Sequence, residues 1–553
     1  DQGYGDFGFT GNPHVQTPQL DQLAEGSIRL NNFYVSPVCA PTRSSLMTGR
    51  YSLRTGVRDT YNGGATMATE EVTLAEMLKE AGYATGVFGK WHLGDNYPFR
   101  PGDQGFDESL IHLSGGMGQP GDFTTYFKMD RSYFDPTLWY NGKQKSFLGY
   151  CSDIFTDEAI HFVEKQSKDQ PFFLYLSFNA PHTPLQVPDK YYEKYKDIDP
   201  SSGFENQNMP FPKMSEKDKE DARKVYAMVS NIDDNIGKLM QKLEELDIAE
   251  NTIFVFMTDN GPQQSRYVGG LRGRKGSVYR GGVRVPFLIK YPKVLATNKE
   301  VNTTLAHIDV MPTLAELCQA KLPEDRRIDG QSFAGILKGE GKSETGFEQS
   351  PLFFYWTRKL PELYDNVAIQ QGPYKLVGNT GFDAKPKDFE LFHLEKDPYE
   401  LENLVEQEQE KAEELKESMD QLVEELTASP NLKEEQRPII GTSHENPLVL
   451  NRNDASGQRG IWTQEEVYGY WNVQILEGMY NIRYKFIKPL EKPGKVMLET
   501  NTQIIQTHIR DMPTDIIELK NVSLKAYKGS VTPHFMSGGK SIFPLWVEFE
   551  RID

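Results

Sequence analysis

The 553-residue sequence has few cysteines, no long apolar run and no excess of positive charge. Its three cysteines, Cys39, Cys151 and Cys318, are too few and too widely spaced for a disulfide framework or a tetrahedral zinc site. A single Cys151–Cys318 disulfide stays open beside the alternative of buried free thiols. Because no stretch reaches the roughly 18 consecutive apolar residues of a membrane-spanning helix, we expect no membrane span.

The net charge of −18 argues against nucleic acid as a partner, because phosphate binding needs a basic surface. It does not exclude a small anionic substrate. A few Lys and Arg side chains in one pocket act locally, since the field of distant surface charges is screened within about 10 Å at ordinary salt. The length of the chain predicts two or three domains.

Short apolar runs alternate with helix-like segments over the first part of the chain. The runs occupy residues 83–89, 171–178 and 251–258. Segments with helical spacing occupy residues 73–82, 153–166 and 221–246. Apolar runs of this kind are typical of strands that are buried on both faces. The alternation predicts an α/β domain over residues 1–345, with a parallel or mixed sheet between layers of helices.

The pattern changes after this domain. Residues 346–430 read as antiparallel strands with Gly and Pro turns, followed by a helix at 405–427, which indicates a small α+β subdomain. Residues 428–445 are polar and read as a linker. Residues 446–553 alternate apolar and polar side chains with almost no helical spacing, so we predict an additional C-terminal β-sandwich domain there.

Polar side chains follow each of the three apolar runs. Lys90 and His92 come after the first run, His182 after the second, and Asp259 and Asn260 after the third. Ligands of open α/β sheets bind beyond the carboxyl ends of the strands. We therefore expect these five residues to lie near one site.

The most specific segment is Cys39-Ala-Pro-Thr-Arg43, continued as SSLMTGR over residues 44–50. It resembles the signature of the type I sulfatases, a family of the alkaline-phosphatase-like superfamily. Further stretches also resemble the family and occur in the same order: Asp1 with GYGDFG (3–8), GKWHLG (89–94), NAPHTP (179–184), TDNG (258–261) and Lys275 within RKGSVYRGGVRVP (274–286). The resemblance covers about residues 1–430 and implies an alkaline-phosphatase-like fold.

The resemblance implies that a maturation enzyme oxidises Cys39 to formylglycine. One hydroxyl of the hydrated aldehyde attacks sulfur in this family, and the other then expels sulfate. The remaining catalytic residues that it implies are Arg43, Lys90, His92, His182 and Lys275. These residue types suit the chemistry, because a sulfate monoester is an anion whose leaving group needs a proton. Arg and Lys supply positive charge, and His moves protons near neutral pH.

The resemblance also implies one divalent metal, held by Asp1, Asp259, Asn260 and the group derived from Cys39. Oxygen donors suit a hard cation, so we expect Ca²⁺, with Mg²⁺ as the alternative. The family carries two adjacent Asp at the end of its first strand. Asp1 corresponds to the second of them, so the first Asp and its strand lie outside this sequence.

Three further groups of residues carry weaker signals. Ser114, in HLSGGMGQPGD (112–122), lies where the family often has a polar residue that touches sulfate, so we predict a substrate contact. His307 and Asp309 begin an amphipathic segment, and we expect them to cap or pack a helix rather than to bind metal. Four aromatic residues of the C-terminal domain fit either sugar contact or packing, with packing favoured: Trp462, Tyr468, Tyr470 and Trp471.

The function expected is hydrolysis of a sulfate monoester, on a sulfated small molecule or glycan. A likeness to enzymes that act on galactose or N-acetylgalactosamine sulfates favours a glycan. One alternative is a phosphonate monoester or phosphodiester hydrolase of the same superfamily, although TDNG lacks the extra His ligands of two-metal phosphatases. The other is a catalytically inactive glycan-binding protein. The resemblance implies a periplasmic or secreted location.

Overall fold

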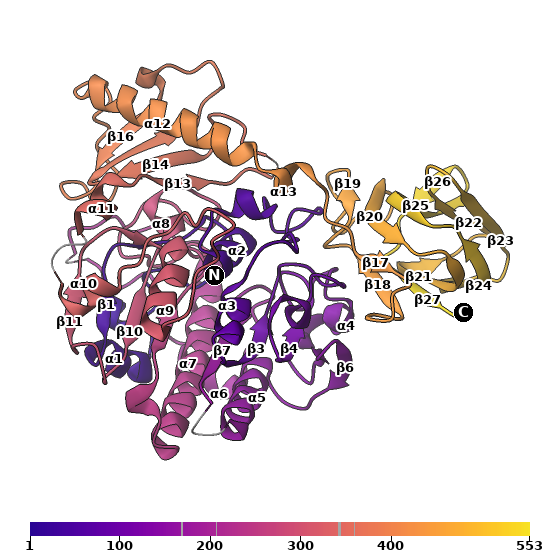
Figure 1. The fold of residues 1–553 in the computed structure, drawn as a ribbon, viewed down its shortest axis with the longest axis horizontal. Helices are drawn as coiled ribbons and strands as arrows, with labels where there is room; N and C mark the ends of the chain where they lie inside the picture. Colours follow the sequence, from indigo (N-terminus) through magenta and orange to yellow (C-terminus); the bar gives the residue numbers. More distant parts are fainter. Residues whose placement is uncertain (167–169, 206, 341–343, 359) are drawn as a thin grey trace.

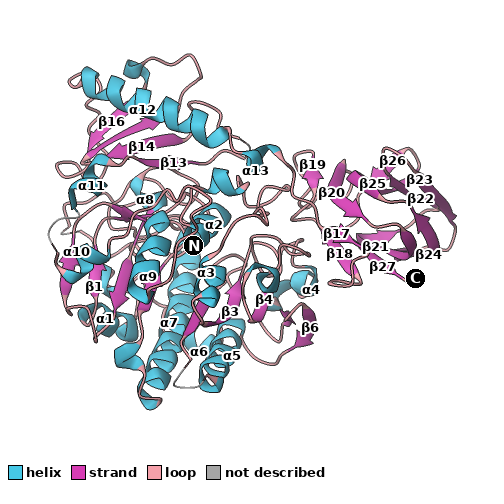
Figure 2. Cartoon of the chain, viewed as in Figure 1, coloured by secondary structure: helices cyan, strands magenta, loops and turns pink. Residues whose placement is uncertain are grey.

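The computed structural model describes residues 1–166, 170–205, 207–340, 344–358 and 360–553. Figure 1 shows a large α/β body, a sheet covered by a long helix along one side of it, and a β-rich part formed by the C-terminal residues. Figure 2 shows that helices are concentrated in the body and strands in the C-terminal part. None of the helices in the described ranges has the length and apolar character that crossing a membrane requires.

One sheet of the body has five strands in the order β6-β5-β4-β3-β7. Its bounds are β3 (Ala84–Lys90), β4 (Glu108–His112), β5 (Thr137–Tyr140), β6 (Lys143–Ser146) and β7 (Phe172–Ser177). Strand β3 runs parallel to both β4 and β7, whereas β5 and β6 are antiparallel to their neighbours. The carboxyl ends of β3 and β7 therefore meet at one edge, as the sequence predicts.

The third apolar run belongs to a different sheet, with the order β11-β1-β10-β8. Its bounds are β1 (Ile28–Leu30), β8 (Phe254–Met257), β10 (Phe287–Lys290) and β11 (Lys299–Val301). Strand β8 pairs antiparallel with β10. The expectation of burial on both faces holds for β3 but is wrong for β7 and β8, whose side chains are mostly half-buried. Each of these two strands ends its sheet and so has a neighbour on one side only.

Helices cover both faces of these sheets. Val87 of β3 packs into one core, together with side chains of α3 (Leu74–Glu80) and α9 (Val310–Cys318). The next residue, Phe88, packs into the opposite core with α5 (Cys151–Lys165) and α7 (Glu216–Glu245). Successive side chains of a strand point to opposite faces, so one apolar run supplies both cores.

Smaller elements complete the body. A three-stranded sheet has the order β12-β2-β9. The strands of this sheet are β2 (Phe33–Tyr34), β9 (Arg284–Val285) and β12 (Leu305–Ala306). The remaining helices of the body are α1 (Pro18–Glu25), α2 (Cys39–Thr48), α4 (Phe123–Tyr126), α6 (Asp189–Tyr192), α8 (Arg280–Val283), α10 (Ala334–Lys338) and α11 (Glu344–Gln349).

The predicted α+β subdomain is an antiparallel sheet with one long helix against it (Figure 1). The strands are β13 (Leu352–Tyr355), β14 (Val367–Gln371), β15 (Tyr374–Gly378) and β16 (Glu390–His393). Helix α12 (Gln409–Thr427) starts four residues later than the predicted segment at 405–427.

The C-terminal residues form two sheets around a shared apolar core. The first contains β17 (Ile439–Ile440), β19 (Ser456–Gly457), β20 (Gly469–Ile475), β22 (Gly494–Glu499), β23 (Ile504–Ile509), β25 (Tyr527–Ser537) and β26 (Lys540–Ile542). The second contains β18 (Leu448–Asn451), β21 (Gly478–Leu490), β24 (Thr514–Leu524) and β27 (Trp546–Arg551). The expected linker at 428–445 is partly structured, because it contains α13 (Pro430–Lys433) and because β17 pairs with β20. The predicted domain boundaries stay predictions.

Candidate active site

Cys39 is the first residue of α2, and every residue of this helix is buried. Figure 1 places the N-terminus of the chain close to α2. Burial raises the pKa of the Cys39 thiol, but the positive charges of Lys90, Lys275 and Arg43 outweigh it and hold the pKa below the ordinary value. Position 39 therefore lies in a buried, electropositive environment.

The end of β3 brings Lys90 beside Cys39. Gly89 has a φ of 120°, and a Cβ there would lie 1.9 Å from the carbonyl oxygen of Ser177, so only glycine lets β3 approach β7 this closely. The next side chain, Lys90, is 2% exposed. Burial lowers the pKa of Lys90 to about 8, and the charges of Arg43 and Lys275 add to this effect.

His92 contacts Cys39 directly. Its Nδ1 lies 3.5 Å from Cys39 Sγ, and its Nε2 lies 2.7 Å from the carbonyl oxygen of Thr60. A carbonyl only accepts hydrogen bonds, so we assign the ring proton to Nε2. Burial and the charge of Lys90 keep the pKa of His92 well below its usual range. The neutral ring thus presents an acceptor nitrogen to position 39.

Asp1, Asp259, Asn260 and Lys275 lie together although they are far apart in sequence. Arg43 donates to Asp259 over 3.0 Å. Asn260 Nδ2 lies 3.1 Å from Asp1 Oδ1, and Lys275 Nζ lies 2.5 Å from the same oxygen. Burial opposes ionisation of Asp259, but the surrounding positive charges hold its pKa well below the usual value. The loop after β8 thus joins the group at the end of β3.

The oxygen atoms of this group fit a hard cation. Asp1 Oδ2 and Asn260 Oδ1 are buried and have no hydrogen-bond partner among the described residues. Unpaired buried oxygens are costly unless another group, such as a cation, satisfies them. No cluster of three or more His, Cys, Asp and Glu side chains suited to a metal occurs in the described ranges. The donors here are two carboxylates and one amide.

His182 faces the same carboxylate from the loop after β7. Its Nδ1 lies 2.8 Å from the carbonyl oxygen of Thr183, so Nδ1 donates and Nε2 carries the lone pair. His182 Nε2 lies 4.0 Å from Asp1 Oδ2. Burial, with the charges of Lys275 and Lys90, keeps the pKa of His182 well below its usual range.

Ser114 is fully buried, and its Oγ has no hydrogen-bond partner among the described residues. A Cβ on Gly121 would lie 2.5 Å from Ser114 Cβ, so the serine side chain packs against that glycine. The following glycines pack against the two candidate histidines: a Cβ on Gly115 would lie 2.6 Å from the His92 ring, and one on Gly116 would lie 2.8 Å from His182 Nδ1. The substrate contact predicted for Ser114 stays a prediction.

The C-terminal sandwich supports this Ser114 segment. The backbone N–H of Ser114 donates to both carboxylate oxygens of Asp95, over 3.1 and 3.0 Å. Asn451, at the end of β18, donates to Asp95 Oδ2 over 2.8 Å, and all of these groups are buried. One buried carboxyl group therefore links the sandwich to the segment that packs against both histidines.

The substitution Asn451→Ala is expected to destabilise the protein by about 1–3 kcal/mol, because Asp95 loses a buried hydrogen-bond donor. Turnover is expected to fall as well, since the Ser114 segment loses its support. Urea unfolding followed by fluorescence measures the first effect. The exposed residue Asn501 provides the control, and equal unfolding free energies for Asn451→Ala and Asn501→Ala would contradict the expectation.

Several other predictions from the sequence concern residues outside the group around Cys39. Asp309 accepts hydrogen bonds from the backbone N–H groups of Ala306 and Gln331, each over 2.8 Å, and His307 contacts Ser36 Oγ over 3.1 Å. The expected capping and packing role of this pair is confirmed. All three cysteines are free thiols, so the Cys151–Cys318 disulfide is not formed.

The aromatic residues of the C-terminal domain divide into buried and exposed ones. Trp471 is 1% exposed and belongs to the core, as packing predicts. Trp462 and Tyr470 are half-buried, and Tyr468 is 55% exposed. Packing therefore explains Trp471 but not all four rings.

Sequence reasoning missed two residues that hold the site together. Tyr175 accepts a hydrogen bond from Arg43 over 3.3 Å, yet in sequence it is one member of an apolar run. Arg266 is fully buried, pairs with Asp6 over 2.7 and 2.6 Å, and donates to the carbonyl oxygen of Asp1 over 2.8 Å. Asp6 lies in the GYGDFG stretch, which was the one local signal for this pair.

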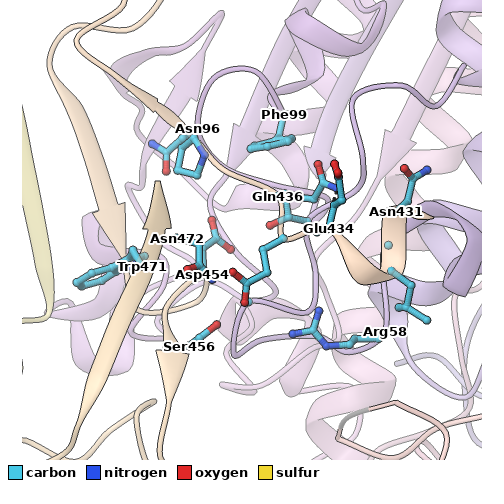
Figure 3. A pocket seen from close by; sticks show the side chains of 16 residues that line it. Arg58, Asn96, Phe99, Asn431, Glu434, Gln436, Asp454, Ser456, Trp471 and Asn472 are labelled. Carbon is cyan, nitrogen blue, oxygen red and sulfur yellow. Dashed lines mark hydrogen bonds between the residues drawn. The ribbon is translucent and has the colours of Figure 1, made fainter. Parts of the chain in front are cut away.

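Figure 3 shows a pocket at the seam between the body and the C-terminal domain. Its walls come from the segments around Arg58 and Asn96, the segment 431–438, and the C-terminal residues Asp454, Ser456 and Asn472. None of the candidate catalytic or metal-binding residues lines it. The pocket is therefore separate from the residues that the sequence predicts for catalysis and metal binding.

Comparisons with known proteins show which family the chain resembles. Residues 1–320 match the family model described as sulfatase, and residues 274–429 match the one described as N-sulphoglucosamine sulphohydrolase, C-terminal. The chain belongs to the sulfatase family. The expected alkaline-phosphatase-like α/β fold is confirmed by solved sulfatase structures.

Two relatives and one structure give the extent of the similarity. Arylsulfatase J of Mus musculus is 32% identical over 343 residues, which cover 60% of this chain and 53% of the relative. The ulvan-active sulfatase of Formosa agariphila is 33% identical over 348 residues, which cover 60% of this chain and 62% of the relative. The structure of Ps i-CgsB in complex with k-i-k-neocarrahexaose superposes with a TM-score of 0.64 and 29% identity, over 76% of this chain and 90% of that one. This sulfatase-family chain thus spans little more than half of the first relative's length.

Proposed function

We propose that the chain hydrolyses a sulfate monoester of a glycan, with Cys39 converted to formylglycine by a maturation enzyme. The observation that carries the proposal is the convergence on Cys39 of the buried cations Arg43 and Lys90, the partly buried Lys275, two neutral histidines and a carboxylate–amide group. A formylglycine at position 39 would supply, as its hydrate, one hydroxyl for attack on sulfur and a second for release of sulfate.

Arg43, Lys90 and Lys275 would bind the sulfate oxygens and stabilise the charge that develops on them. His92 Nδ1 faces position 39 and would accept and return the proton of the hydroxyl there. His182 would protonate the leaving oxygen in its imidazolium form, which a bound sulfate anion favours, because Nε2 then carries a proton on the side of Asp1. Asp259 keeps Arg43 in place through their ion pair.

Asp1, Asp259 and Asn260 would hold one divalent cation, with position 39 as a further ligand. We propose Ca²⁺, with Mg²⁺ as the alternative, because all of these donors are oxygens. Such a cation would supply Lewis-acid charge to a sulfate oxygen. It would also satisfy the unpaired oxygens of Asp1 and Asn260.

A sulfated glycan is the proposed substrate. The relative from Formosa agariphila is named an ulvan-active sulfatase, and the Ps i-CgsB structure contains a neocarrahexaose. Galactose or N-acetylgalactosamine sulfate remains the specific prediction. A panel of sulfated monosaccharides and oligosaccharides measures it: release of sulfate from glucosamine sulfates alone would contradict it. A periplasmic or secreted location also stays a prediction.

The competing hydrolase activity is tested by a second substrate set. We expect kcat/KM for p-nitrophenyl sulfate to exceed that for bis-p-nitrophenyl phosphate and p-nitrophenyl phenylphosphonate by at least about a hundredfold. The reverse order would identify a phosphonate or phosphodiester hydrolase. Binding of sulfated oligosaccharides without any turnover, by protein with formylglycine at position 39, would identify a glycan-binding protein.

The activity is expected to fall as the pH rises through about 8, where Lys90 loses its charge. The ammonium form attracts sulfate, so kcat/KM should drop by up to about tenfold per pH unit above this value. Substitution Lys90→Arg keeps the charge and should move the alkaline limb to higher pH. The exposed residue Lys165 gives the control substitution Lys165→Arg, and identical alkaline limbs in all three proteins would contradict the assignment.

A further inference from the structure

Three aromatic rings and one arginine gather outside the group around Cys39. The guanidinium carbon of Arg358 lies 4.8 Å from the ring centre of Tyr61 and 5.0 Å from that of Trp356. Trp462 meets Tyr61 edge to face, with the ring centres 5.3 Å apart. We call Tyr61, Trp356, Arg358 and Trp462 the aromatic–arginine cluster. Its members come from the α/β body, the segment after β13 and the C-terminal domain.

A buried carboxylate orients two members of this cluster. The indole N–H of Trp356 donates to Asp59 Oδ1 over 3.2 Å, and Arg358 lies 3.8 Å from the same oxygen. Asp59 itself is 1% exposed, whereas the Arg358 side chain is 55% exposed. A flexible side chain alone would lose conformational entropy on binding a ligand. Here the guanidinium is held in advance and still faces solvent.

Two contacts connect the cluster to residues of the proposed sulfate site. Between Asp59 and Tyr61 lies Thr60, whose carbonyl oxygen holds His92 over 2.7 Å. On the other side, a Cβ on Gly276 would lie 2.8 Å from the Trp356 ring, and Gly276 directly follows Lys275 in sequence. A ligand on the cluster would therefore lie next to a group bound by His92 and Lys275.

The side chains of the cluster match the chemistry of a charged sugar. Aromatic rings provide apolar faces for sugar rings, and arginine binds sulfate or carboxylate groups through two parallel hydrogen bonds. A chain with a net charge of −18 offers no general attraction for polyanions. Recognition of an anionic glycan therefore depends on local cations, and Arg358 provides one outside the group that would hold the reacting sulfate.

We propose that the aromatic–arginine cluster is a subsite for an anionic sugar unit adjacent to the unit that loses its sulfate. The substrate is then an anionic oligosaccharide or polysaccharide, and the C-terminal domain contributes Trp462 to its recognition. This inference rests on the proposed sulfatase function. It adds a second sugar unit, with its own charge, to that function.

The test compares a long substrate with a short one in the same variants. The probes are neocarrahexaose and ulvan oligosaccharides on one side, and p-nitrophenyl sulfate with galactose sulfates on the other. In Arg358→Ala, the ratio of kcat/KM for the oligosaccharides to that for the small esters is expected to fall about tenfold to a hundredfold, mainly through KM. Trp462→Ala should lower the same ratio. Arg510, an exposed arginine of the C-terminal domain, gives the matched control Arg510→Ala.

Binding is measured separately from catalysis. Calorimetry with the Cys39→Ala protein is expected to show weaker binding of neocarrahexaose or of the ulvan oligosaccharides when Arg358→Ala is added, by a similar factor. Unchanged kcat/KM ratios together with unchanged binding in Arg358→Ala would overturn the proposed subsite. The proposal would also be overturned if the wild-type protein hydrolyses small sulfate esters but neither binds nor cleaves any of the oligosaccharides. If the wild type binds oligosaccharides through Arg358 but hydrolyses no sulfate ester, the subsite stands and the proposed activity fails.

Discussion

Replacement of Cys39 by alanine is expected to lower kcat for sulfate ester hydrolysis by at least about a thousandfold, because the reacting group is lost. The change removes one buried sulfur atom at the start of α2, so the fold should be retained. Turnover of p-nitrophenyl sulfate measures the first effect and circular dichroism the second. Mass spectrometry of the peptide around residue 39 in the unaltered protein should show an aldehyde in place of the thiol.

Cys318 supplies the control for this substitution. It is a free thiol whose pKa is raised by burial, in contrast to the lowered pKa of Cys39. Cys318→Ala should therefore keep the activity of the unaltered protein. Full activity of Cys39→Ala, or an unmodified thiol at position 39 in fully active protein, would contradict the proposed chemistry.

Removal of divalent cations with EDTA is expected to lower turnover at least about a hundredfold, and added Ca²⁺ should restore it. The physical reason is the pair of unpaired buried oxygens on Asp1 and Asn260, beside the ionised Asp259. Lys275 pairs with the carboxylate of Asp1. A cation held by Asp1 would share this carboxylate with the lysine.

Two measurements besides activity check the cation. Calorimetry should show one Ca²⁺ bound per chain, and the bound cation should raise the thermal unfolding temperature. In Asn260→Ala both effects should weaken, because one oxygen donor is lost, whereas the exposed-site variant Asn501→Ala should behave as the unaltered protein. Full turnover by protein that contains no metal would contradict the proposal, and restoration by Mg²⁺ alone would change the ion assigned.

Local sequence predicted the parts of the site that lie on single elements. Cys39 and Arg43 are four residues apart in α2, so both reach the same side of this helix. Lys90 ends β3 and His92 follows it, and the rule that ligands bind at carboxyl strand ends predicts that both lie near one site. Helix α12 starts four residues later than predicted, and strand β17 lies inside the expected linker. Local sequence therefore predicts the boundaries of elements less accurately than their existence.

Contacts between distant segments could not be read in the same way. The run at 251–258 has the apolar character of the other two, but only its pairing with β10 shows that it joins a separate sheet in antiparallel orientation. The link from Asn451 through Asp95 to Ser114 depends on how the C-terminal sandwich packs against the body. Periodicity describes which face of an element is apolar and not which partner covers it.

The sequence by itself determined the family and predicted the residue types of the candidate active site and the strands and helices that present them. Only the tertiary structure decided which charges neutralise one another: Lys275 with Asp1, and Arg43 with Asp259. It also decided that Asp59 holds Trp356 and Arg358 beside the site. The reason is that these pairs are separated by hundreds of residues, so their contacts follow from packing of the whole chain and leave no local pattern.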